Sequence, residues 1–189
     1  MTSPDPVDYH GLTPDVLLDA VEHCGYRTDG RFLALNSYEN RVYQVGVEDA
    51  NPVIAKFYRP LRWSNEAILE EHEFACALAQ QDIPVVAPEI IKGASLHTHA
   101  GYRFALYPRQ GGHWPELNTL EQREWMGRFI ARLHLVGASR PFTHRPALDI
   151  ESFGERSYTY LLGEGFIPAH IETAYRTLAE DLLQQIEDI

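Results

Sequence analysis

The 189-residue sequence is poor in cysteine, in lysine and in long apolar runs. Its two cysteines, Cys24 and Cys76, form no CxxC motif and are too few for a disulfide framework, so a reducing cytoplasm is the expected compartment. The longest apolar runs span only a few residues, which excludes a transmembrane helix. The N-terminal segment MTSPDPVDYH has neither a basic nor an apolar region, so the sequence predicts no signal peptide.

Positive charge is scarce as well. There are 16 Lys and Arg residues against 27 Asp and Glu residues, which gives a net charge of −11 with histidine neutral. Nucleic acids and anionic membranes would repel such a chain, so neither is an expected partner. Lysine occurs only as Lys56 and Lys92, and all other basic residues are arginine. A lysine in an apolar setting therefore suggests a need for its compact ammonium group.

The length and a hydrophobic content of 44% fit a globular chain of one or two small domains. A strand-rich first half with one long helix is followed by a Gly-containing linker, PRQGG, and then by a helical half. We expect an α+β fold with an N-terminal lobe over residues 1–107, a hinge over 108–112 and a helical C-terminal lobe over 113–189.

The expected elements follow from apolar periodicity and capping residues. Thr13-Pro14 begins a helix that Gly25 ends, Ser64 caps a helix over residues 65–81, Thr119 and Gln122 form a capping box, and the last helix begins near Pro168. Five segments are predicted strands: residues 32–35, 42–47, 53–58, 85–91 and 102–107. The first three have short connections and predict an antiparallel meander.

Lys56 interrupts the apolar segment Val53–Tyr58, where a buried ammonium group is costly unless it is paired. A lysine at a sheet edge that extends to solvent is an equally open interpretation. On the next helix, Glu71 falls within the apolar stripe that includes Ile68 and Leu78, whereas Glu73 falls nearly opposite. Glu71 therefore also needs a partner, and Lys56 is the obvious one.

A strand lysine paired with a helix glutamate, just after a two-strand turn, is the arrangement that holds nucleotide phosphates in protein kinases. The turn here, residues 36–40, has the sequence NSYEN and contains no glycine. The Ser37 hydroxyl and the turn amides could still donate to phosphate oxygens. An ordinary Asn-rich hairpin has the same appearance, so the turn alone is a weak signal.

Six segments, in this order, resemble the bacterial stress response kinase A family of the aminoglycoside phosphotransferase and choline kinase-like superfamily. They are LNSYENRVYQV, IAKFYRPLRW, ILEEHEFACALAQQDIPVVAPEI, YRFALYPRQGG, MGRFIARLH and FTHRPAL. The resemblance extends over roughly residues 12–189 and is most specific in NSYENRVYQ and KFYRP. It implies a protein-kinase-like fold and ATP-dependent phosphorylation of protein serine or threonine, with Mg²⁺, in a cytoplasmic stress response. The protein substrate stays unidentified.

The resemblance also implies roles for individual residues. Ser37 resembles the turn residue that contacts ATP, Lys56 the lysine that positions the phosphates, and Glu71 its helix partner. The segment from Tyr107 to Gly112, which includes Arg109, resembles the hinge that receives the adenine.

The catalytic loop of such kinases is missing from the sequence. They require an Asp that orients the substrate hydroxyl and an Asn five residues later that binds magnesium; in this superfamily these lie in an HGDxHxxN-like loop. None of the five Asn residues is preceded by Asp at that spacing. His144-Arg145-Pro146 resembles an HRD motif only superficially, because Pro146 replaces the Asp. We therefore expect no catalytic residue and no metal ligand in this chain, with both beyond residue 189.

The last helix has an apolar stripe from Ile171 to Ile189 and no terminating residue. Either a partner covers this stripe or further chain does, so we expect the isolated chain to self-associate. The leading hypothesis is the nucleotide-binding part of a kinase, inactive alone. The alternative is a non-catalytic module that binds a nucleotide or a protein. A metal-dependent hydrolase using the nine histidines is a distant third.

Overall fold

The computed structural model describes residues 8–187, which divide into two compact units that meet between His144 and Arg145. The first unit contains α1 (Pro14–His23), β1 (Thr28–Leu35), β2 (Arg41–Val47), β3 (Val53–Phe57), α2 (Asn65–Gln80), β4 (His97–His99), β5 (Tyr102–Pro108) and α3 (Leu120–Ala138). The second contains a π-helical turn (Glu151–Glu155), α4 (Arg156–Gly163) and α5 (Ala169–Glu187). The predicted α+β class is confirmed. The lobe boundaries at residues 108–112 stay a prediction.

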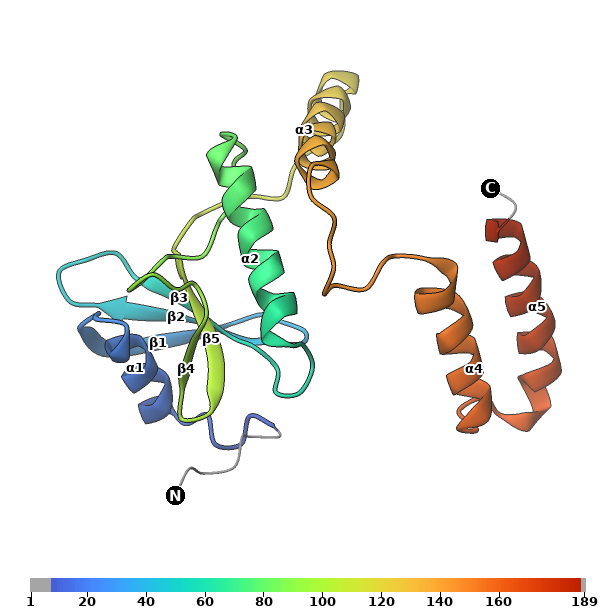
Figure 1. Ribbon diagram of the computed structural model, residues 1–189, viewed down its shortest axis with the longest axis horizontal. Coiled ribbons are helices and arrows are strands. Elements are labelled where there is room, and N and C mark those ends of the chain that lie inside the picture. The colour runs from blue at the N-terminus through green and yellow to red at the C-terminus, as the bar shows by residue number, and fades with distance from the viewer. Residues whose placement is uncertain (1–7, 188–189) are drawn as a thin grey trace. The chain divides into compact units, whose positions relative to one another are not determined.

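The strands of the first unit form one antiparallel sheet in the order β1-β2-β3-β5-β4, with five strands among the described residues. Because side chains alternate across a strand, Val53, Ala55 and Phe57 of β3 lie on one face and Ile54 and Lys56 on the other. The sheet lies between α1 and α2 (Figure 1). Each helix therefore covers a different face of β3.

The main core lies between α1 and the sheet. Phe57 and Phe104 are fully buried there and stack with their ring centroids 5.2 Å apart. Helix α1 contributes Leu17, Ala20 and Val21, each at most 1% exposed. Thr13 caps the helix by accepting a hydrogen bond from the Val16 amide at 3.3 Å. The predicted start of this helix and its inward face are therefore confirmed.

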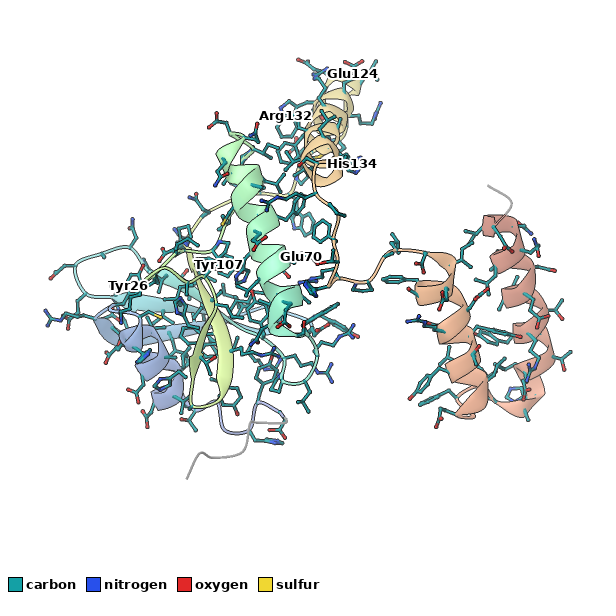
Figure 2. The ribbon with its side chains drawn as sticks, in the orientation of Figure 1. Tyr26, Glu70, Tyr107, Glu124, Arg132 and His134 are labelled. Atoms are coloured by element: carbon teal, nitrogen blue, oxygen red, sulfur yellow. The ribbon has the colours of Figure 1, made fainter. Side chains whose placement is uncertain are left out.

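Helix α2 lies over the opposite face of the sheet. Ser64 is its N-cap and accepts from the Ala67 amide at 3.1 Å, as the sequence predicts. Ile68 is fully buried against Tyr58 and Ala105. On its other side α2 meets the segment after α3, where Glu70 accepts from the amides of Thr143 at 2.5 Å and His144 at 3.1 Å (Figure 2). The helix is thus held on two sides.

The strand predicted over residues 85–91 is wrong. Pro84 and Pro88 have no N–H to donate to a ladder. The segment instead makes one backbone hydrogen bond to β5, from the Glu89 amide to the Leu106 carbonyl at 2.8 Å. The fifth strand is β4, His97–His99, which pairs with the beginning of β5 and is not among the predicted strands.

In the second unit, α4 and α5 lie side by side (Figure 1), and the Tyr158 hydroxyl donates to Glu180 at 2.5 Å. The predicted amphipathic last helix is present as α5. In the first unit, the predicted capping box of Thr119 and Gln122 is confirmed at the start of α3. The apolar stripe of α5 is 45% to 61% exposed at Ile171, Leu178, Leu182 and Ile186. Ile189, the last residue of the predicted stripe, lies outside the described residues. Self-association stays a prediction.

We expect Leu106→Ala to lower the free energy of unfolding by about 2–5 kcal/mol, because Leu106 is fully buried in β5 and its removal leaves a cavity. Leu61→Ala is the matched control, since Leu61 is 77% exposed, and it should change stability by no more than about 0.5 kcal/mol. Chemical denaturation of the 189-residue chain measures both. Equal losses in the two variants would contradict the assignment of the core.

Candidate functional site

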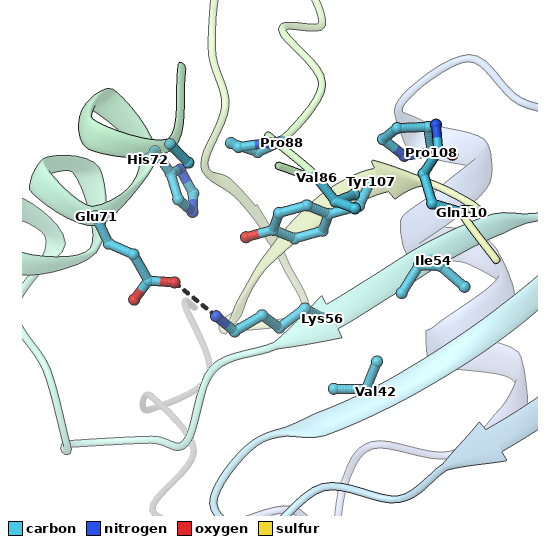
Figure 3. Close-up of a pocket in the computed structure, with 11 residues that line it drawn as sticks. Val42, Ile54, Lys56, Glu71, His72, Val86, Pro88, Tyr107, Pro108 and Gln110 are labelled. Atoms are coloured by element: carbon cyan, nitrogen blue, oxygen red, sulfur yellow. Dashed lines mark hydrogen bonds and ion pairs between the residues drawn. The ribbon is translucent and has the colours of Figure 1, made fainter. Parts of the chain in front are cut away.

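A pocket of about 380 Å³ lies between α2 and the face of the sheet that carries Lys56 (Figure 3). Strands β2 and β3 supply its floor through Val42 and Ile54, and Tyr107 and Pro108 come from the end of β5. Most of the lining is apolar; the charged side chains of Lys56 and Glu71 lie at the α2 side, and Gln110 lies at the other end beside Pro108 (Figure 3). The lining residues are Val42, Ile54, Lys56, Glu71, His72, Ala75, Val86, Pro88, Tyr107, Pro108 and Gln110.

The predicted ion pair is present in this pocket. The Lys56 Nζ lies 2.7 Å from the Glu71 Oε1, and the two side chains are 22% and 36% exposed (Figure 3). The ammonium also lies 4.8 Å from the centroid of the Tyr58 ring, where a cation–π interaction adds to its stabilisation. The interpretation of Lys56 as a lysine that simply extends to solvent is therefore wrong.

The local sequence explains why these two groups meet. Lys56 stands in the central strand β3, paired with Val42 of β2 on one side and Ala105 of β5 on the other. Its side chain must leave the sheet on the face opposite to Ala55 and Phe57. Ile68 anchors α2 on that same face, and Glu71 follows it by three residues, which is almost one helical turn.

Next to Glu71, His72 is a residue that the sequence reading missed. It is 1% exposed, with its Nε2 2.6 Å from the Tyr58 hydroxyl and its Nδ1 2.9 Å from the Ser95 hydroxyl. The Tyr58 hydroxyl in turn lies 3.1 Å from that of Tyr107. The signal was the spacing of four residues from Ile68 to His72, which the acidic neighbours in the EEHE run concealed.

Tyr107 is half-buried at the end of β5 and its ring lines the pocket (Figures 2 and 3). Burial raises the pKa of its phenol to about 12, partly opposed by the hydrogen bond with Tyr58, while the negative charge of Glu71 adds to the rise. The phenol is therefore neutral at physiological pH. It presents an uncharged, planar wall to the pocket.

Two of the predicted site residues lie outside the pocket lining. Ser37 is exposed in the turn between β1 and β2, and its hydroxyl donates to the Asn40 carbonyl at 2.6 Å, so the hydroxyl closes the turn. The turn is also tied to the segment after β3, because Glu39 accepts from the Trp63 indole at 3.1 Å. Arg109 is exposed and does not line the pocket, whereas the adjacent Pro108 and Gln110 do.

The described residues supply no group of three or more His, Cys, Asp or Glu side chains that could hold a metal ion. Glu71 is engaged by Lys56, so the pocket itself offers no complete set of magnesium ligands within residues 8–187. Over the same range, none of the helices is long and apolar enough to cross a membrane.

The arrangement has two chemical capacities. The Lys56 ammonium is paired with Glu71 but is still partly exposed, so it can also bind an anionic group such as a phosphate. The apolar floor and the Tyr107 wall can hold a planar, largely apolar ring. The two capacities are adjacent within one pocket, so one ligand could use both.

Comparison with known proteins identifies the family of this chain. A sequence model described as the phosphotransferase enzyme family matches residues 31–186. Stress response kinase A of Salmonella choleraesuis (strain SC-B67) is 37% identical over 180 residues, which cover 95% of this chain and 55% of that protein. The protein of the same name from Escherichia coli (strain K12) is 36% identical over 178 residues, covering 94% and 54%. The chain thus spans about half the length of these relatives.

A Salmonella typhimurium (strain LT2) relative named serine/threonine protein kinase RdoA is 37% identical, covering 95% of this chain and 55% of that protein. Among solved structures, amicoumacin kinase hAmiN in complex with AMP-PNP, Ca²⁺ and Ami matches with a TM-score of 0.66 at 18% sequence identity. That match covers 93% of this chain and 54% of the kinase, and it confirms the predicted kinase-like fold. The resemblance to stress response kinase A is confirmed, and the chain belongs to the phosphotransferase enzyme family.

Proposed function

We propose that this chain is the nucleotide-binding part of an ATP-dependent protein kinase that phosphorylates serine or threonine in a bacterial stress response. One observation carries the proposal: the Lys56–Glu71 ion pair, 2.7 Å long, stands at the polar end of an otherwise apolar pocket. Kinases use such a pair to hold nucleotide phosphates. The names of the relatives support the reaction and its setting.

The residue roles in this proposal follow the pocket. The adenine enters between the apolar floor and Tyr107, near the hinge segment 108–112, and the phosphates reach the Lys56 ammonium. Glu71 orients that ammonium. Ser37 closes the β1–β2 turn so that its backbone amides can face the phosphates, and Arg109 reaches the nucleotide from the hinge only if its exposed side chain turns toward the pocket.

The chemistry is in-line transfer of the γ-phosphoryl group to a hydroxyl, in which positioning and charge stabilisation do most of the catalysis. Mg²⁺ would neutralise the phosphate charge. The sequence contains no Asp followed by Asn five residues later, so we assign the group that orients the hydroxyl, and the metal ligands, to the part of the relatives that this chain does not cover. We assign the protein to the cytoplasm, where ATP is supplied and the thiols of Cys24 and Cys76 stay free.

A second candidate is a module that binds a nucleotide or a protein and transfers nothing. The absence of the Asp-x₄-Asn pattern from the sequence favours it for the chain by itself. A nucleotide-binding module shares the pocket with the first candidate and differs in that no phosphoryl transfer follows, whereas a protein-binding module does not require ATP.

We expect Lys56→Met to weaken the binding of MgATP by about 10- to 100-fold, because a charge-assisted contact to phosphate is lost. Lys92→Met is the matched control, since Lys92 donates to the His23 carbonyl and does not line the pocket. The affinity of this variant for MgATP should equal that of the wild type. Isothermal titration calorimetry of the purified chain measures both. Equal affinity in Lys56→Met and the wild type would remove Lys56 from the site.

We also expect the purified chain to bind ATP without transferring phosphate, because the sequence lacks the Asp-x₄-Asn pattern. Incubation with γ-labelled ATP, Mg²⁺ and a general Ser/Thr protein substrate measures the transfer. Transfer above background, abolished by Lys56→Met, would show that catalytic groups are present after all. A folded chain with no affinity for ATP would favour the protein-binding module.

A further inference from the structure

Beside the Lys56–Glu71 pair lies a second connection between α2 and the sheet, a buried hydrogen-bonded chain through His72. The His72 ring spans the hydroxyl of Tyr58 at 2.6 Å and that of Ser95 at 2.9 Å. Tyr58 follows β3 directly, two residues after Lys56, and His72 follows Glu71 by one residue. Helix α2 and the end of β3 are therefore joined twice, once by the Lys56–Glu71 ion pair and once by the His72–Tyr58 hydrogen bond.

The hydrogen bonds that begin at His72 continue through Tyr58 to the other end of the pocket. The Tyr58 hydroxyl lies 3.1 Å from the Tyr107 hydroxyl, and the Tyr107 ring forms the wall near the hinge. His72 also meets the Tyr107 ring edge to face, with the centroids 6.4 Å apart. The chain His72–Tyr58–Tyr107 thus connects the helix that carries Glu71 to the proposed adenine wall.

Burial makes this connection strong. His72 and Tyr58 are 1% and 2% exposed, and Ser95 is 8% exposed, so solvent cannot replace a lost partner. Hydroxyl groups can donate or accept, so each of them can match whichever role the facing ring nitrogen takes. Removing one member takes a buried hydrogen bond from its neighbours, which is costly.

We propose that His72 is a positioning residue for the nucleotide site, an inference that rests on the proposed function. Through Tyr58 it holds α2 so that Glu71 stays within reach of Lys56, and through Tyr58 and Tyr107 it fixes the wall opposite the apolar floor. The Lys56–Glu71 pair, with side chains 22% and 36% exposed, is the more accessible of the two connections. The His72–Tyr58 bond keeps α2 in place while the Lys56 ammonium bonds both Glu71 and a phosphate.

The two lysines of the sequence provide a test that needs no nucleotide. Acylation of lysine amines, quantified by mass spectrometry, follows Lys56 in the pocket and Lys92 as an internal reference outside it. In His72→Phe we expect Lys56 to react about threefold faster, the size set by loss of a half-exposed ion pair, and Lys92 to react as in the wild type. His72→Gln, which keeps a donor and an acceptor, should restore part of the protection.

Tyr58→Phe removes only the hydroxyl and keeps the ring beneath the Lys56 ammonium. It should reproduce the effect of His72→Phe, and the double variant should go no further, because both changes break the same connection. Leu17→Ala is the control for simple loss of stability. Leu17 is buried under α1 on the opposite face of the sheet, so Lys56 acylation should be unchanged in that variant under native conditions.

Calorimetry with MgATP then connects the inference to function. We expect the affinity of His72→Phe to fall about tenfold, because only a minority of molecules keep the binding-competent arrangement. If the wild type does not bind MgATP, the proposed function fails and the acylation of Lys56 still decides the inference. If the wild type binds MgATP, and His72→Phe matches it in affinity and in Lys56 acylation, the inference is wrong.

Discussion

The ammonium group of Lys56 is the constraint on which the rest of the site depends. It stands on the central strand of the sheet with its side chain only 22% exposed, so the charge is partly removed from water and needs a partner. A carboxylate must therefore reach it from outside the sheet. Helix α2 meets this need through Glu71, and the helix can do so only by lying across the face of β3 that Phe57 does not occupy. The pocket is the space left beside that contact.

This constraint also explains why both an ion pair and a buried hydrogen bond join α2 to the sheet. A phosphate that binds Lys56 shares the ammonium group with Glu71, so the ion pair alone would hold the helix less firmly once the phosphate is bound. The bond between His72 and Tyr58 is buried and does not involve Lys56, so a phosphate at the ammonium group leaves it intact. Stability of the helix and adaptability of the ammonium group are thus supplied by adjacent residues rather than by one.

Local chemistry made much of the fold predictable from the sequence. The caps Thr13, Ser64 and Thr119 each accept from an amide three residues away, so they are independent of tertiary structure, and all three are present. The pairing of Lys56 with Glu71 was predictable because each is an anomaly on an apolar face. The prediction of a strand over 85–91 was wrong because apolar content alone does not make a strand. Pro84 before the segment and Pro88 within it interrupt the row of amides that a ladder needs. Strand β4, with two histidines in three residues, gives no strand pattern at all.

His72 escaped prediction for a different reason, because its partners come from three distant parts of the chain. Tyr58 lies 14 residues from His72 and 49 residues from Tyr107, and Ser95 lies 23 residues from His72. The spacing from Ile68 places His72 on the inner face of α2 but does not reveal the hydroxyl groups that it meets there. The pocket, in contrast, is complete within residues 42–110, whereas the Asp-x₄-Asn pattern of phosphoryl transfer is nowhere in the sequence. In the proposed function, nucleotide binding and phosphoryl transfer therefore depend on separate stretches of sequence, and the binding stretch can be tested by itself.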